Sequence, residues 1–278
     1  MNHYVIVDVF TTVALEGNPL AVFLSAADIP AGRMQLIARE MNLSETTFVL
    51  PARGDGDRRV RIFTPVNELP FAGHPVLGTA AVLGKSMARS RLRLETEAGT
   101  IPVDLQYPSE GTVSACMRQP IPVWEPYRLQ EDLLDALGIK SSTLPVDAYR
   151  NGPRHVYVGV DSEAALSRVQ PDLRALARHP DMAAICFAGS GKRWRMRMFS
   201  PAYGVAEDAA TGSAAGPLAV HLARYGLVPF GQQIEILQGV EMGRPSHMSA
   251  RADGTGQRPH TVEVSGSAVI TAYGTLLV

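Results

Sequence analysis

The stretch RVRIFTPVNELPFAGHPVLGTAAVL, Arg59–Leu83, has an altered second copy in RMRMFSPAYGVAEDAATGSAAGPLAV, Arg195–Val220. When the copies are aligned on their phenylalanine and proline, three extra residues in the second copy bring Gly73 opposite Gly212. Solenoid proteins repeat every 20–50 residues or so, and the distance along the chain between the aligned Phe63 and Phe199 is far longer. The duplication therefore predicts two similar halves within one chain.

The similarity continues upstream of both copies. Each half has a turn and a strand, then a helical stretch, and then two strands joined by a glycine-flanked turn, which is typical of a hairpin. These segments are GNPLAVF (17–23), AGRMQLIAREM (31–41), TTFVL (46–50) and RRVRIF (58–63) in the first half, and NGPRHVYVG (151–159), QPDLRALARH (170–179), AAICFA (183–188) and RWRMRMF (193–199) in the second.

The segments that follow the two aligned glycines, PVLGTAAVLGKSMA and AAGPLAVHLARYG, are small or apolar almost all round. A helix without a polar face is a buried helix. We therefore predict an α+β fold of two pseudo-symmetric domains, each a strand-rich, barrel-like sheet wrapped around a central apolar helix. Ser213 is a good N-cap for the second helix, and Gly226 is a good terminator.

The proline-rich segment QPIPVWEP, residues 119–126, lies between the copies and marks the domain boundary. We expect one domain of residues 1–118 and another of 119–263, with the functional site in the cleft between them. The last strands, TVEVSG and AVITAYGTLLV, could close either half. We assign 264–278 to the first domain, because a returning tail is a common way to finish such a pair.

Composition argues against several classes of function. The chain has 278 residues, of which 46% are hydrophobic and 19% charged, and its net charge of −1 gives no signature of nucleic-acid or membrane-surface binding. The start MNHYVIVDVF lacks the basic region of a secretory signal, and no apolar run is as long as a membrane span. The two cysteines, Cys116 and Cys186, make no disulfide framework. We expect a cytoplasmic protein.

The usual cofactor and metal motifs are also missing from the sequence. GSGKR is similar to the end of a phosphate-binding loop, but Cys186 stands where the leading glycine is needed, and the segment is predicted as a hairpin turn. The seven histidines have no metal-ligand spacing. No nicotinamide, flavin or pyridoxal motif is found, so we expect neither a cofactor nor a metal.

The two buried helices open with Gly73-His74 and Gly212-Ser213. A helix N-terminus has unpaired N–H groups and a partial positive charge, which together favour an anion. In a pseudo-symmetric pair both ends would face the space between the halves. A small carboxylate held by Gly73, Gly212 and Ser213 would fit there. The alternative is that glycine and proline only start two buried helices.

Three side chains near this region are candidates for proton transfer. Glu45, in MNLSETTFVL, is either a solvated surface carboxylate or, if partly buried, a general acid–base with a raised pKa. His74 is either a core histidine or a neutral, proton-handling imidazole at a helix start. Asp208, in AEDAATGS, either caps the second helix or orients the histidine. Ser213 lacks a G-x-S-x-G context, so a serine nucleophile is not expected.

The ordered set of motifs resembles the phenazine-biosynthesis isomerase family, PhzF, whose fold is that of diaminopimelate epimerase. The motifs are DVFTTVALEGNPLAVF, AREMNLSETTFVL, RIFTPVNELPFAGHPVLGTA, NGPRHVYVG, FSPAYGVAEDAATGSAAGPLA and EILQGVEMGRPS, and they cover nearly the whole chain. The resemblance implies a homodimeric enzyme without cofactor or metal. It also implies isomerisation of trans-2,3-dihydro-3-hydroxyanthranilate, a small carboxylate, to an aminoketone.

The resemblance also implies roles for particular residues. The family's catalytic glutamate matches Glu45, its cleft histidine matches His74 and its cleft aspartate matches Asp208. The groups that hold the ligand match three further residues, Gly73, Gly212 and Ser213. Glu45 would take a proton from C3 of the substrate ring and return it to C1 on the same face, while His74 and Asp208 position polar groups or relay protons. The epimerase uses two thiols instead, and neither helix start here has a cysteine.

Three alternatives remain open. The protein could be an isomerase or epimerase of another small carboxylated metabolite, or a non-catalytic protein that binds small carboxylates. A purely structural or interaction role is less well supported, because the sequence has no obvious apolar surface stripe or charged tail.

Overall fold

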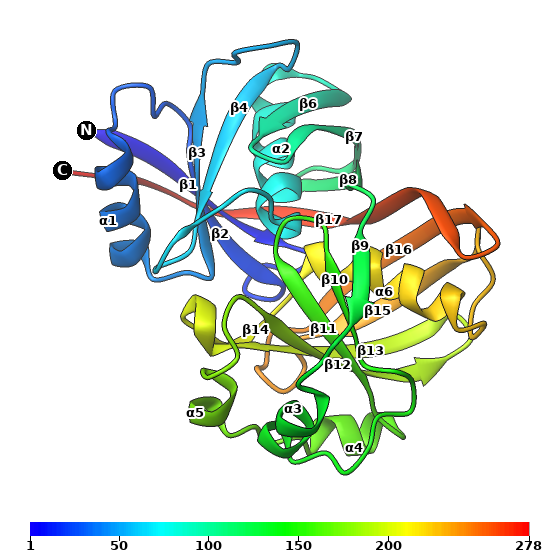
Figure 1. The fold of residues 1–278 in the computed structure, drawn as a ribbon. Coiled ribbons are helices and arrows are strands. Elements are labelled where there is room, and N and C mark those ends of the chain that lie inside the picture. Colours follow the sequence, from blue (N-terminus) through cyan, green and yellow to red (C-terminus); the bar gives the residue numbers. More distant parts are fainter. Residues whose placement is uncertain (278) are drawn as a thin grey trace.

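The computed structural model describes residues 1–277. Its N-terminal part consists of eight strands and two helices (Figure 1). They are β1 (Asn2–Val9), β2 (Asn18–Phe23), α1 (Ala31–Met41), β3 (Glu45–Leu50), β4 (Arg58–Phe63), β5 (Glu68–Leu69), α2 (Gly73–Met87), β6 (Arg91–Thr96), β7 (Gly99–Ser109) and β8 (Thr112–Arg118).

Seven of these strands, all except β5, form an eight-stranded barrel together with β17 (Arg258–Leu276), here called the first barrel. Hydrogen-bonded neighbours run β1-β2-β3-β4-β6-β7-β8, and β17 closes the ring by pairing with β8 and β1. α2 packs against strands on all sides of this ring, and every residue in 73–84 is buried. Small residues make this possible, since a Cβ atom on Gly78 would lie only 2.6 Å from Val9 Cγ2.

The rest of the chain repeats this plan with different details. Its elements are β9 (Val123–Pro126), α3 (Gln130–Leu137), β10 (Asp147–Arg150), β11 (Arg154–Gly159), α4 (Glu163–Ser167), α5 (Leu173–Leu176), β12 (Ala183–Ser190), β13 (Arg193–Ser200), a 3₁₀ turn (Pro201–Tyr203), β14 (Val205–Asp208), α6 (Gly212–Arg224), β15 (Gln233–Gln238), β16 (Ser246–Thr255) and β17.

The second sheet runs β9-β10-β11-β12-β13-β15-β16-β17. α6 packs against β15, β16 and β17, and every residue in 212–222 is buried. The two ends of this sheet approach each other just before β9, where the Gln119 N–H donates to the Val262 carbonyl at 2.9 Å. The predicted fold class, two similar sheets each wrapped around an apolar helix, is confirmed.

β17 belongs to both sheets. It is a single strand of 19 residues, whose start pairs with β16, whose middle pairs with β8, and whose end, from Ala268, pairs with β1. The sequence predicts two closing strands here, but Gly266 and Ser267 stay paired with β8 and join them into one. Figure 1 shows this strand, in orange to red, crossing from one half to the other. The domain division given above stays a prediction.

The helix predicted over 170–179 is much shorter in the structure. α5 begins only at Leu173, after the Asp172 side chain, which caps it by accepting from the N–H groups of Arg174 and Ala175. Pro171 precedes this cap, and a proline disfavours helical conformation in the residue before it. The matching helix of the first half, α1, covers 31–41 as predicted.

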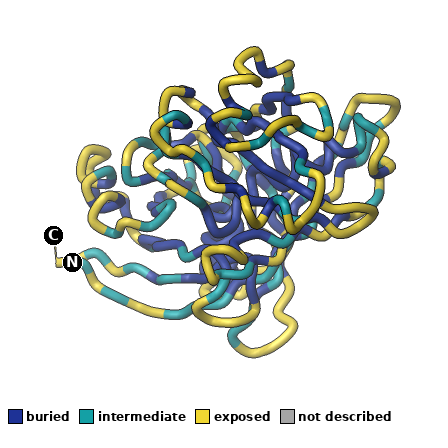
Figure 2. Tube along the Cα trace, turned by 90° about the horizontal axis from the view of Figure 1, so that it is seen from below, coloured by how far each residue is buried: buried dark blue, intermediate teal, exposed yellow. Residues whose placement is uncertain are grey.

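The hydrophobic core is continuous between the two halves. One cluster of buried residues contains Val7 and Leu77 from the first half together with Leu218 and Val264. In Figure 2 the buried trace lies inside the molecule and the exposed trace follows the loops. Within residues 1–277, no helix has the length and apolar character needed to cross a membrane.

Candidate functional site

The two central helices meet end to end. A Cβ atom on Gly73 would lie 2.3 Å from both the Gly212 carbonyl carbon and the Ser213 nitrogen, and one on Gly212 would lie 3.1 Å from the His74 nitrogen. Only glycine allows two backbones to approach this closely. Two partly positive helix ends are brought together in this way, which is unfavourable unless a negative group lies beside them.

His74 is the second residue of α2 and is buried. Its Nδ1 atom lies 3.3 Å from the amide nitrogen of Asn18. Because an amide nitrogen only donates, Nδ1 accepts and the ring proton is on Nε2. Burial lowers the pKa of His74 to about 3. The imidazole is therefore neutral near pH 7, with its N–H on the nitrogen that faces Glu45.

Glu45 is the first residue of β3, and its side chain is 14% exposed. Its Oε2 atom lies 3.4 Å from His74 Nε2, which is long for a hydrogen bond. Both atoms are buried, and neither has a hydrogen-bond partner among residues 1–277. Burial, followed by the negative charge of Asp208, raises the pKa of Glu45 well above its usual value. Such a carboxyl is a stronger base than an exposed one and can accept a proton and return it.

Asp208 ends β14 and is also buried. Its Oδ1 atom accepts from the amide of Asn18 at 2.8 Å and from the hydroxyl of Ser44 at 2.9 Å, and its Oδ2 atom accepts from the hydroxyl of Thr211 at 2.7 Å. Burial raises the pKa of Asp208, and these hydrogen bonds oppose the rise. Since Asn18 also contacts His74, the amide connects the aspartate to the histidine across the two halves.

Ser213 is the second residue of α6 and not its N-cap. The helix begins at Gly212, and Thr211 occupies the cap position, so the capping role predicted for Ser213 is wrong. Thr211 is fixed there because its hydroxyl donates to Asp208. The Ser213 hydroxyl contacts a buried histidine instead, with 3.1 Å between its Oγ and His155 Nε2.

The repeat includes an ion pair that the sequence patterns did not indicate. In the first half Arg61 Nε donates to Glu68 Oε1 at 2.6 Å, and in the second Arg197 Nε donates to Glu207 Oε1 at 2.8 Å. Both pairs are bidentate, which makes them directional as well as strong. Each glutamate lies five residues before the glycine that opens the central helix. The pairs therefore anchor the two segments that lead to the helix ends.

Asn18 and Ser44 were also missed as members of the site. Asn18 is 190 residues from Asp208 along the chain, so no local pattern could pair them. A signal was nevertheless present, because Ser44 directly precedes Glu45 and Asn18 opens β2, the strand that pairs with β3. Both residues also lie within the motifs GNPLAVF and NLSETTFVL.

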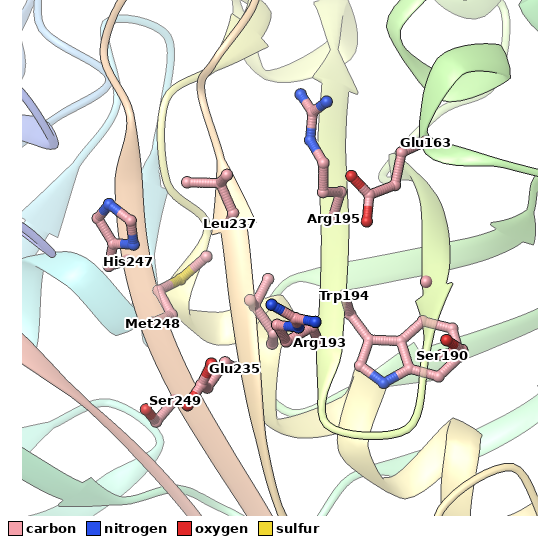
Figure 3. A pocket seen from close by; sticks show the side chains of 12 residues that line it. Glu163, Ser190, Arg193, Trp194, Arg195, Glu235, Leu237, His247, Met248 and Ser249 are labelled. Atoms are coloured by element: carbon pink, nitrogen blue, oxygen red, sulfur yellow. The ribbon is translucent and has the colours of Figure 1, made fainter.

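A cavity of about 630 Å³ lies elsewhere, over β13, β15 and β16 (Figure 3). Arginines and glutamates of opposite charge line it together with Trp194 and His247. Arg195 is already paired with Glu241, at 2.6 Å. None of the six residues predicted for the site lines this cavity, so it is separate from the candidate site at the helix ends.

Comparison with known proteins gives the family. A family model described as phenazine biosynthesis-like protein matches residues 7–274. The chain belongs to this family. Curated relatives of the chain include proteins named trans-2,3-dihydro-3-hydroxyanthranilate isomerase. The one from Pseudomonas aeruginosa is 61% identical over 99% of both chains, and the one from Pseudomonas chlororaphis is 61% identical over 100% of both.

The chain also has the fold of a solved structure. A predicted epimerase from Pseudomonas aeruginosa is 29% identical to the chain, with a TM-score of 0.85 over 100% of both chains. The resemblance to the PhzF family stated from the sequence motifs is confirmed.

Proposed function

We propose that the protein isomerises trans-2,3-dihydro-3-hydroxyanthranilate to its aminoketone isomer in phenazine biosynthesis. Two relatives named trans-2,3-dihydro-3-hydroxyanthranilate isomerase, each 61% identical over nearly their whole length, support this substrate. The observation that carries the chemistry is the facing pair of Glu45 Oε2 and His74 Nε2, which lie 3.4 Å apart and are buried without a hydrogen-bond partner in the described chain. Such atoms are unfavourable unless a ligand satisfies them.

In the proposed mechanism, Glu45 removes the proton at C3 of the substrate ring and delivers it to C1 on the same face. Each of the two ring double bonds ends one position nearer C3, which leaves an enol at C3 and C4. The enol tautomerises to the ketone, so no atom is lost and the aminoketone product is an isomer. The raised pKa of Glu45 makes its carboxylate a stronger base than an exposed one and lets the acid keep the proton until it is returned. The N–H of His74 positions a polar group of the substrate.

The substrate carboxylate would lie at the paired helix ends, where N–H groups and two partial positive charges favour an anion. The backbone there comes from Gly73, Gly212 and Ser213. The side chains of Glu45 and His74 are only 14% and 3% exposed, so a six-membered ring would reach them only when the halves move apart. Reclosure would then exclude water and keep the proton from exchanging.

Turnover of synthetic dihydro-hydroxyanthranilate, followed by absorbance, tests the function. Glu45→Gln keeps the side-chain shape but removes the base, so we expect kcat to fall at least about 100-fold. Glu40→Gln, at an exposed position on α1, is the matched control and should leave kcat unchanged. A Glu45→Gln protein that isomerised the substrate at the wild-type rate would show that the assignment is wrong.

Two alternatives give different results in the same assay. An isomerase or epimerase of another carboxylated metabolite would leave dihydro-hydroxyanthranilate unchanged and convert only its own substrate. A protein that only binds small carboxylates would exchange no substrate proton in deuterated water.

The proposal also includes a cytoplasmic homodimer that needs no cofactor. This part of the proposal rests on the family resemblance, and light scattering in solution tests the dimer.

A further inference from the structure

A second polar pair lies at the other helix end, in the half that lacks Glu45. His155 on β11 is only 1% exposed, and its Nε2 atom lies 3.1 Å from Ser213 Oγ. Ser213 is the aligned counterpart of His74, and each is the second residue of its helix. Each helix therefore presents its second residue to a buried polar side chain, which is Glu45 for His74 and His155 for Ser213.

The register of the two sheets explains why the second residue of the helix faces a glutamate in one half and a histidine in the other. In the first half, Glu45 opens β3 and pairs with Leu20 on the neighbouring parallel strand. In the second half, Ala183 opens the corresponding strand β12 and pairs with His155 on β11. Paired residues on adjacent strands point to the same face of a sheet. The second half thus has alanine in place of the carboxylate, and an imidazole on the neighbouring strand contacts the helix end.

The surroundings of His155 decide which ring nitrogen has the proton. Its Nδ1 atom is buried and has no hydrogen-bond partner within residues 1–277. A buried N–H without an acceptor is rarer in proteins than an acceptor without a donor, so the proton belongs on Nε2. Burial, followed by the charge of Arg150, lowers the pKa of His155 to about 3. The ring is therefore neutral near pH 7, and its Nε2–H donates to Ser213 Oγ.

We propose that His155 is a positioning residue, which directs the hydroxyl hydrogen of Ser213 away from the imidazole and toward the substrate carboxylate at the helix ends. The inference rests on the proposed function in one respect, that a carboxylate lies there. When Oγ accepts from His155, its own hydrogen is left to donate to the ligand. Ser213 then adds a side-chain donor to the backbone N–H groups of the helix end, and without His155 the hydroxyl can rotate away.

Two variants separate this role from simple packing. In His155→Gln the new side chain has its amide nitrogen near the former Nε2 position, whereas His155→Asn has its amide near Nδ1 and too far from Ser213. We expect His155→Asn to raise KM about tenfold with kcat nearly unchanged, as for a lost hydrogen bond to a charged group. His155→Gln should keep KM near the wild-type value. His155→Ala replaces the asparagine variant in these assays if that variant does not fold.

A double-mutant cycle tests the coupling to Ser213. Ser213→Ala should raise KM by a similar factor, and adding His155→Asn to it should change KM no further, because both substitutions remove the same contact. If the two effects on KM multiply, or if His155→Asn has the wild-type KM, His155 does not act through Ser213 and the inference is wrong.

Calorimetric binding of anthranilate separates this inference from the proposed function. Anthranilate has the carboxylate but is already aromatic, and aniline lacks the carboxylate. If the wild-type protein does not turn over dihydro-hydroxyanthranilate, the proposed function fails. The binding of anthranilate still measures the contact between Ser213 and a ligand carboxylate. We expect His155→Asn to raise the Kd of anthranilate about tenfold and to leave aniline binding unchanged. Equal weakening of both ligands, or no binding of anthranilate to the wild type, would overturn the inference.

Discussion

Replacing Gly73 by alanine tests whether the contact between the two helix ends sets the geometry of the site. The added Cβ would lie 2.3 Å from both the Gly212 carbonyl carbon and the Ser213 nitrogen, whereas ordinary contacts begin at 3.4 Å. Both obstacles are backbone atoms, which cannot rotate out of the way. The helix ends must therefore separate by about 1 Å, and overpacking of this kind costs about 1–3 kcal/mol.

The same displacement should affect catalysis, because His74 follows Gly73 directly. A shift of about 1 Å in a catalytic group can lower the rate about 100-fold. Urea unfolding measures the stability of the variant, and absorbance assays with dihydro-hydroxyanthranilate measure kcat and KM. Gly32→Ala in α1 is the control, since its Cβ meets nothing within 4 Å and alanine favours helix. A Gly73→Ala protein with wild-type stability and kcat would refute the reasoning.

Other residues of the site give separate expectations. Asp208→Asn removes a charge that raises the pKa of Glu45, so the acidic limb of kcat/KM should move to lower pH in whatever activity remains; an unmoved limb would contradict this. Asn18→Leu deprives Asp208 and His74 of their shared donor, and the free energy of unfolding in urea should fall by about 2–4 kcal/mol. Burial lowers the pKa of His221 from 6.5 to about 3. Between these values the unfolded chain binds a proton that the folded one does not, so the free energy of unfolding decreases as the pH is lowered, by about 1.4 kcal/mol per pH unit. His221→Phe should make that slope shallower in urea titrations.

The duplication is the part of the fold that could be predicted from the sequence. Both copies keep the glycine at the start of an apolar helix, so aligning the two copies was enough to place Gly73 opposite Gly212. The apolar character of the helices predicted that each is wrapped by a sheet. The junction within β17 could not be predicted, because Gly266 and Ser267 are typical of a turn, and only their pairing with β8 keeps them extended.

The candidate site was proposed from two recognisable helix starts and from the local context of single residues. Glu45 and His74 could be proposed from local context, but the contact between them depends on the fold of the first barrel. Asn18 lies within the motif GNPLAVF, but its role comes from three acceptors that distant parts of the chain bring together. His155 has the local context of an ordinary strand residue, and only the sheet register places it beside Ala183.

The path of β17 has a consequence for biosynthesis on the ribosome. The residues that seal the first barrel, Ala268–Leu276, pair with β1 and are translated after the whole second sheet. Until then β1 and β8 are unprotected sheet edges, which are prone to aggregation, and closing them needs a contact between distant parts of the chain. Nascent chains stalled before residue 268 should be cut by protease within the first half, and resistance there should appear only when β17 is complete. The half that is made first is thus the last to be finished.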